Sequence, residues 1–234
     1  MFGEMRSGMK TGTCIRILWT DLAGSPREFQ RQKSGFFPEN EAQRIGRFVR
    51  ETDRRLRFAA ACLLTELVGE LPGAGAGVSI ERNHYGRPQL NGIEHADISV
   101  SHSGEIVVCA LSTQGSIGID IEQERPVEIG DFVRVFPESL WSWMHHGNPS
   151  DGDDREPENR RFFHAWTRLE SVAKAHGKGL SSPLGDFVFE DKHARLGTES
   201  WRLHTIPVYE GYVCSLAVNG KIVQQEIRRA VCCI

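Results

Sequence analysis

The sequence predicts an α+β fold made of two similar halves, each a helix followed by antiparallel strands. Two observations support this prediction. Apolar residues recur at helical spacing in 39–70 and again in 160–176, and each stretch precedes short strand-like runs separated by turn signals. The 234 residues suffice for one large domain or two of about 115 residues each. We expect an N-terminal half at 1–125 and a C-terminal half at 126–234, joined through an exposed acidic loop near 147–159.

The first half begins with the helical stretch 39–70. Its pattern is interrupted near Glu51–Thr52, where Asp53 is suited to cap the second part, and Gly69 and Pro72 end it. Four strand-like runs follow, bounded by Gly, Pro and Asn turns, at 78–82, 97–101, 106–112 and 116–122.

The second half has a helix at 160–176, with Gly177 suited to end it. Strand-like runs then follow at 186–190, 200–206, 211–218 and 221–228. Asn219-Gly220 between the last two runs is the strongest hairpin signal in the chain, so we expect those two strands to pair.

Composition excludes several classes of protein. Apolar residues make up 39% and charged residues 25%, which is typical of a globular protein, and the net charge of -3 gives no reason to expect nucleic acid or a membrane as a partner. The sequence contains neither a run of about 18 apolar residues nor the apolar centre of a signal peptide, so we expect a cytoplasmic protein. The six cysteines lack the CxxC spacing of a zinc ribbon.

An acidic pair stands out in the segment Ser116–Glu122. Isoleucines alternate with Gly118, Asp120 and Glu122, so the two carboxylates share one face of a strand, about 6–7 Å apart. Such carboxylates repel each other unless a proton or cation lies between them, and Mg²⁺ prefers oxygen ligands. The alternative is a half-buried strand whose outer face happens to be acidic, and spacing alone favours it.

A second pair lies on the helix 160–176. Glu170 and Lys174 are separated by four residues, in the favourable order, on a stripe beside the apolar one. On spacing alone, an exposed ion pair worth about 0.3–0.5 kcal/mol is the favoured interpretation.

Basic residues form a third group that is unusual in a net acidic chain. Arginines crowd the helical region 44–57, Arg87 lies in a Gly-Arg-Pro turn, and His102 lies between two serines. This concentration suggests an anion site, such as one for phosphates. For most of the arginines a solvated helix face is the simpler interpretation, and a lone His102 is more often a hydrogen-bonded core residue.

Taken together, the motifs resemble the 4′-phosphopantetheinyl transferases of the large, Sfp type. The matching segments are Gly86-Arg-Pro88, Ile98–Ser103, Ile117–Glu122, Trp166–Lys174 and Gly177–Leu180. They follow the family's order and approximate spacing over residues 40 to 185. The resemblance implies a pseudo-dimer of two α+β halves with the site in the cleft between them. It also implies transfer of the phosphopantetheine arm of coenzyme A to a serine of an apo acyl or peptidyl carrier protein. Adenosine 3′,5′-bisphosphate would be released. Fatty acid, polyketide and nonribosomal peptide biosynthesis are all open as pathways.

The resemblance also implies roles for individual residues. Asp120, Glu122 and Glu170 would bind Mg²⁺, Glu170 would be the first choice for the base, and Lys174 would stabilise or protonate the leaving phosphate. The phosphates of coenzyme A would be held by Arg87, Ser101 and His102, with Arg44, Arg47 and Arg55 near the 3′-phosphate. Because a pseudo-dimer supplies both halves of the site, we expect a monomer.

Two departures from the family pattern matter. Leu169 stands where the family usually has lysine before the motif glutamate, and Arg87 replaces the lysine of a Gly-Lys-Pro turn. Leu169 falls at the centre of the apolar stripe, so we expect it to face the core. A catalytically weak paralogue that only binds a coenzyme A-like ligand or a carrier protein is therefore an alternative, and a Mg²⁺-dependent phosphohydrolase is a weaker one.

Overall fold

The computed structural model describes residues 12–23, 37, 41–75, 77–146 and 157–230, and for His146 the backbone alone. The helices are α1 (Glu41–Gly46), α2 (Glu51–Gly69), α3 (Glu138–His146) and α4 (Glu158–His176), with short 3₁₀ turns at Ile129–Phe132, Gly179–Ser181 and Leu184–Asp186. None of the described helices has the length and apolar character needed to cross a membrane. Most of the predicted loop near 147–159 lies outside the described residues.

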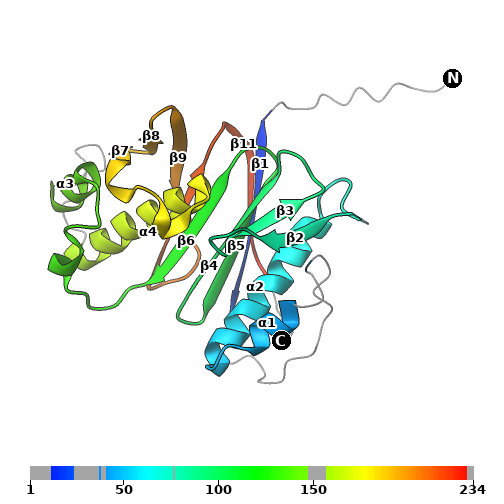
Figure 1. Ribbon diagram of the computed structural model, residues 1–234. Helices are drawn as coiled ribbons and strands as arrows, with labels where there is room; N and C mark the ends of the chain where they lie inside the picture. Colours follow the sequence, from blue (N-terminus) through cyan, green and yellow to red (C-terminus); the bar gives the residue numbers. More distant parts are fainter. Residues whose placement is uncertain (1–11, 24–36, 38–40, 76, 147–156, 231–234) are drawn as a thin grey trace.

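The first sheet has the strand order β11-β1-β5-β4 and is covered on one face by α2 (Figure 1). Its strands are β1 (Thr13–Asp21), β4 (Asp97–Ser103), β5 (Ile106–Ser112) and β11 (Ile222–Arg229). Leu63 and Leu67 of α2 belong to the same buried cluster as Val107 and Cys109 of β5. A separate two-stranded ribbon is formed by β2 (Ser79–Arg82) and β3 (Pro88–Asn91).

The second sheet has the order β6-β10-β9-β8-β7 and is antiparallel throughout. Its strands are β6 (Ile117–Gln123), β7 (Val188–Glu190), β8 (His193–Leu196), β9 (Glu199–Thr205) and β10 (Tyr212–Val218). Helix α4 packs on it, and Leu169 and Val172 share a buried cluster with Val213 and Ala217. Each half thus pairs one long helix with a sheet, which confirms the predicted α+β class.

A third core lies between the two sheets. Ile117, Ile119 and Ile121 of β6 pack there with Ile17 of β1 and Val108 of β5. The opposite face of β6 meets α4 so closely that a Cβ atom on Gly118 would lie 1.9 Å from the carbonyl oxygen of Ser171. The alternation predicted for this strand is therefore confirmed, and the space left by Gly118 admits the backbone of α4.

The predicted hairpin at Asn219-Gly220 is wrong. Strand β11 does not pair with β10 but runs parallel to β1 in the other sheet, with Ile17 opposite Ile227. The physical reason is that a strand can pair only with a neighbour that still has an unpaired edge. Both edges of β10 are occupied, by β6 and β9, whereas β1 offers the edge that β5 leaves open. Gly220, with φ of 118°, directs the chain from one sheet to the other.

Each sheet contains one strand from the other predicted half of the sequence. β6 precedes residue 125 but pairs with β10, and β11 follows residue 126 but pairs with β1. Sheet membership alone does not define a folding unit, so the division into 1–125 and 126–234 stays a prediction. What the arrangement does establish is that β6 and β4, each at the edge of its own sheet, lie beside each other in the middle of the molecule.

Candidate active site

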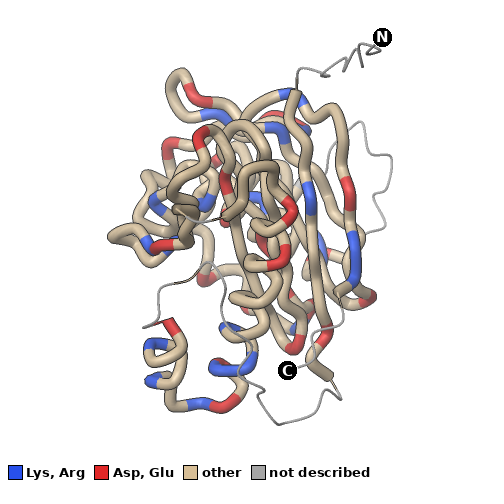
Figure 2. The backbone as a smooth tube through the Cα atoms, turned by 90° about the vertical axis from the view of Figure 1, so that its right-hand side faces the viewer, with Lys and Arg blue, Asp and Glu red and all other residues tan. Residues whose placement is uncertain are grey.

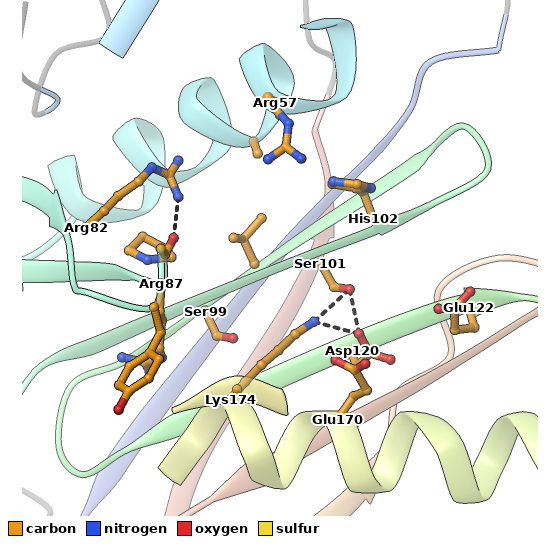
Figure 3. A pocket seen from close by; sticks show the side chains of 16 residues that line it. Arg57, Arg82, Arg87, Ser99, Ser101, His102, Asp120, Glu122, Glu170 and Lys174 are labelled. Atoms are coloured by element: carbon orange, nitrogen blue, oxygen red, sulfur yellow. Dashed lines mark hydrogen bonds and ion pairs between the residues drawn. The ribbon is translucent and has the colours of Figure 1, made fainter. Parts of the chain in front are cut away.

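A cavity of about 400 Å³ opens where the two sheets meet (Figure 3). Its walls come from α2, the β2–β3 ribbon, β4, β6 and the C-terminal end of α4. The charged and hydroxyl-bearing side chains that line it are Arg57, Arg82, Tyr85, Arg87, Ser99, Ser101, His102, Asp120, Glu122, Glu170 and Lys174. Figure 2 shows acidic and basic residues interspersed along the backbone. The separation of acidic side chains from basic ones inside this cavity is therefore a local feature.

Side chains rather than backbone groups join β4 to β6 along one side of the cavity. On β4, the residues at every second position point toward β6. Asp97 and Ser99 accept hydrogen bonds from the amides of Ile117 (2.9 Å) and Ile119 (3.0 Å). Further along, Ser101 donates to Asp120 and Ser103 donates to Glu122, both at 2.7 Å. We call this set, Asp97, Ser99, Ser101 and Ser103, the β4 seam.

Asp120 is the most deeply buried carboxylate of the site, with 3% of its surface exposed. Its Oδ1 accepts hydrogen bonds from Lys174 Nζ at 2.6 Å and Ser101 Oγ at 2.7 Å, while the buried Oδ2 has no hydrogen-bond partner among the described residues. Burial raises the pKa of Asp120, and Lys174 and Ser101 oppose that rise. The alternative interpretation, a half-buried strand whose outer face happens to be acidic, is therefore wrong at Asp120, which lies in a strand buried on both faces at this position.

Glu170 reaches the same cavity from α4. Burial raises the pKa of Glu170 to about 7, and the negative charge of Asp120 adds to the rise while Lys174 opposes it. Lys174, one turn further along, donates to Asp120 and Ser101 and to the carbonyl oxygen of Ile119 at 3.2 Å. The stripe that carries both residues faces the cavity, so the simple surface ion pair is also ruled out.

The carboxylates of the cavity suit a divalent cation. No three Asp, Glu, His or Cys side chains among the described residues are gathered closely enough to form a finished metal site. Yet the buried Oδ2 of Asp120 has no partner in this part of the chain, and the pKa of Glu170 is raised by burial first and by the negative charge of Asp120 second. Both features favour the arrival of positive charge, and oxygen donors are the ligands that Mg²⁺ prefers.

The opposite wall is basic. Arg82 donates to the buried Glu41 at 2.8 Å and to the carbonyl oxygen of Gly86 at 2.9 Å. Arg57 lies over the ring of Phe48, 3.9 Å from its centroid. Burial lowers the pKa of His102, and the nearby charges of Arg57 and Lys174 lower it further, so this imidazole is neutral at pH 7.

The predicted coenzyme-binding residues have different surroundings. Arg87, Ser101 and His102 line the cavity, although Arg87 already bonds Asp97 at 2.6 Å and the carbonyl oxygen of Ile117 at 3.0 Å. Arg44 forms two 2.7 Å hydrogen bonds with Glu41 and is not part of the lining, and neither is the exposed Arg47. The assignment of these five residues to coenzyme phosphates stays a prediction.

Sequence reasoning did not single out Arg57 and Arg82. Arg82 carried a usable signal, because in β2 it shares a face with Ile80, which is fully buried. Arg57 was one of several arginines on α2, and only the tertiary structure separates it from its neighbours. Leu169 is fully buried in the core behind α4, which confirms the prediction made for it.

Comparison with known proteins agrees with this arrangement. A family model described as the 4′-phosphopantetheinyl transferase superfamily matches residues 116–217, and one described as 4′-phosphopantetheinyl transferase, N-terminal, matches residues 23–114. The chain is 28% identical over 171 residues to 4′-phosphopantetheinyl transferase Sfp of Bacillus subtilis, covering 73% of each chain. It is 27% identical over 201 residues to 4′-phosphopantetheinyl transferase gsp of Aneurinibacillus migulanus, covering 81% of each. The two family models meet just before β6, the strand that carries Asp120, and together they span most of the sequence. The chain therefore belongs to the 4′-phosphopantetheinyl transferase superfamily, among its Sfp-type members.

Proposed function

We propose that the protein transfers the 4′-phosphopantetheine arm of coenzyme A to a serine of an apo acyl or peptidyl carrier protein and releases adenosine 3′,5′-bisphosphate. The observation that carries the proposal is the sorting of charge in one cavity, where carboxylates from β6 and α4 face arginines from α2 and β2. Coenzyme A has a pyrophosphate at the reacting end and a separate phosphate on its ribose, so it needs both a metal-assisted site and a basic one.

In this reaction the serine oxygen attacks the phosphorus that carries the pantetheine arm. A new P–O bond forms to serine, the bond to the bridging oxygen breaks, and its electron pair leaves with the 5′-phosphate of adenosine 3′,5′-bisphosphate. The proton of the serine must be accepted within the site. Glu170 is suited to that role, because its pKa of about 7 lets the carboxylate hold a proton near neutral pH and release it afterwards.

Lys174 places positive charge where the leaving phosphate gains negative charge. Its ammonium group is fixed by three hydrogen bonds, to Asp120, Ser101 and the backbone of Ile119. A charge held in place before the reaction stabilises developing negative charge without further rearrangement.

Asp120, Glu122 and Glu170 are the residues that would hold Mg²⁺. When bound, the ion would neutralise the pyrophosphate and stabilise charge on the attacked phosphorus. Arg57, Arg82 and Arg87 would hold phosphate oxygens at the basic wall, with the neutral His102 donating a hydrogen bond. The two halves of one chain supply both walls, so we propose that the active form is a monomer.

Mass spectrometry of a carrier protein tests this function. The purified protein is incubated with coenzyme A, Mg²⁺ and an apo carrier, and the expected result is a carrier whose mass increases by one phosphopantetheine arm. A carrier in which the acceptor serine is replaced by alanine is the control and should stay unmodified. Tight binding of coenzyme A with no mass increase on any of a panel of apo carriers would contradict the proposal and favour the binding-only alternative.

A further inference from the structure

The β4 seam gives each carboxylate of β6 a serine partner. Ser101 donates to Asp120 and Ser103 donates to Glu122, both at 2.7 Å. Residues two apart on a strand point the same way, so the two serines match the two carboxylates across the seam. Ser99, two residues before Ser101, instead accepts a hydrogen bond from the backbone amide of Ile119.

The geometry around Ser103 fixes the direction of its hydroxyl. Its oxygen accepts a hydrogen bond from the amide of Gln123 at 3.0 Å and donates its proton to Oε2 of Glu122. A hydroxyl has a single proton, so accepting from the backbone on one side directs that proton to the carboxylate on the other. The backbone of β6 thus orients Ser103, and Ser103 in turn orients Glu122.

Glu122 has a competing partner that points the other way. Arg125 lies 3.2 Å from the same Oε2, and its side chain is 59% exposed, toward solvent rather than the cavity. Without the hydroxyl of Ser103, this exposed arginine would be the remaining hydrogen-bond partner of the carboxylate among the described residues. Both hydrogen bonds that the described residues make to Glu122 end on Oε2, so Oε1 is the oxygen that can bind a cation.

We propose that Ser103 is a positioning residue that holds Glu122 in the orientation required to bind the divalent cation. The inference rests on the proposed function for its catalytic meaning, but metal binding tests it independently. Ser101 makes the matching contact to Asp120 and also accepts a hydrogen bond from Lys174, while its assignment to the coenzyme phosphates stays a prediction.

Three variants separate positioning from general stability. Ser103→Ala removes the hydroxyl, Ser103→Thr keeps it on a strand-compatible side chain, and Ser99→Ala removes a hydrogen bond of the same seam that ends on a backbone amide. The probe is Mn²⁺, whose free and bound forms are counted by electron paramagnetic resonance, in the presence of coenzyme A and with no carrier protein. Thermal midpoints measured without metal verify that each variant is folded.

We expect Ser103→Ala to weaken Mn²⁺ binding five- to tenfold, with Ser103→Thr and Ser99→Ala within twofold of the parent protein. In transfer assays, Ser103→Ala should raise the Mg²⁺ concentration for half-maximal rate by a similar factor and leave kcat at saturating Mg²⁺ within threefold. Unchanged Mn²⁺ binding in Ser103→Ala, or equal weakening in Ser99→Ala, would overturn the inference. Failure of the parent protein to modify any carrier would instead contradict the proposed function, and the Mn²⁺ result would still decide the role of Ser103.

Discussion

The two walls of the cavity differ in how their charged side chains are paired within the protein. On the basic wall, Arg82 pairs with Glu41 and Arg87 pairs with Asp97, so these guanidinium groups have anionic partners within the protein. On the acidic wall, Lys174 is the cation that opposes the rise in pKa of both Asp120 and Glu170.

Glu41 illustrates the difference. Burial disfavours its ionised form, but hydrogen bonds from Arg44 and Arg82 outweigh burial and lower the pKa of Glu41. Asp120 is enclosed more completely and has a single cationic partner, Lys174, so burial outweighs the hydrogen bonds from Lys174 and Ser101 and the pKa of Asp120 is raised. Two arginines of the basic wall thus already have anionic partners, whereas Asp120 and Glu170 on the acidic wall share Lys174 as the cation that lowers their pKa.

The largest effect should follow from changing the acidic wall at its centre. Asp120→Asn keeps the shape of the side chain but removes the charge that pairs with Lys174, so transfer should fall more than a hundredfold at saturating Mg²⁺. The thermal midpoint without metal should change little, because loss of the ion pair is offset by relief of repulsion with Glu170. Transfer within tenfold of the parent protein would show that Asp120 is not a metal ligand.

The second-largest loss of activity should follow from removing Lys174, the lysine of the acidic wall. Lys174→Ala should lower kcat/KM more than tenfold, and because Lys174 lowers the pKa of Glu170, its loss should shift the rise of activity to higher pH. Exposed Lys192, which lies between β7 and β8 and is not part of the cavity lining, provides the control, and Lys192→Ala should leave kcat/KM within threefold. An unshifted pH profile in Lys174→Ala would separate Glu170 from the proton transfer.

Changes in the basic wall should affect coenzyme binding more than turnover. Arg57→Ala should weaken the affinity for coenzyme A about tenfold, within the range for hydrogen bonds to charged groups. Arg134 lies exposed before α3, and Arg134→Ala is the control that should leave the affinity unchanged. Calorimetric titration measures both, and equal affinities in the two variants would remove Arg57 from the coenzyme site.

Leu169 lies behind the acidic wall rather than in it, so its replacement should cost stability more than activity. Leu169→Lys places a charge in a fully buried site and should lower the thermal midpoint by several degrees, while kcat/KM changes less than tenfold. Leu169→Met, which conserves volume, controls for packing. A tenfold or larger gain in kcat/KM from Leu169→Lys would mean that the absence of the family's usual lysine at this position limits the rate. It would favour the weak-paralogue alternative.

The smallest expected effect is on how the free energy of unfolding changes with pH. The pKa of Glu170 is raised in the folded state from 4.5 to about 7, so between these values the folded protein binds more protons than the unfolded chain. Stability should therefore fall as pH rises through this interval without metal. Glu170→Gln should flatten the slope and be more stable than the parent protein at pH 8. Thermal midpoints at pH 5 and pH 8 measure it, and equal slopes in the two proteins would contradict the raised pKa.

The sequence predicts the site better than it predicts how the site is built. The local patterns place Asp120 on a strand face and Glu170 on a helix stripe, but spacing alone favours a structural interpretation of both, and their roles in a site are implied by the resemblance to the family. The partnership between Ser101 and Asp120 spans 19 residues and two sheets, so no local pattern contains it. The hairpin error has the same origin, because a turn signal says nothing about which strand edges are still free. Strand β1 was missed although Ile15 and Ile17 are spaced for a strand, because no turn signal marked its ends.

The parallel pairing of β1 with β11 has a consequence for how the chain is made. β1 leaves the ribosome long before its partner β11, because Thr13 of β1 lies opposite Ile222 of β11. Until β11 is synthesised, one edge of β1 has no neighbour within its sheet and can pair with another chain. Contacts between such distant segments form slowly because the intervening loop must close first. Shortening the chain before Ile222 should therefore give a protein that aggregates during synthesis even though every residue lining the cavity is present.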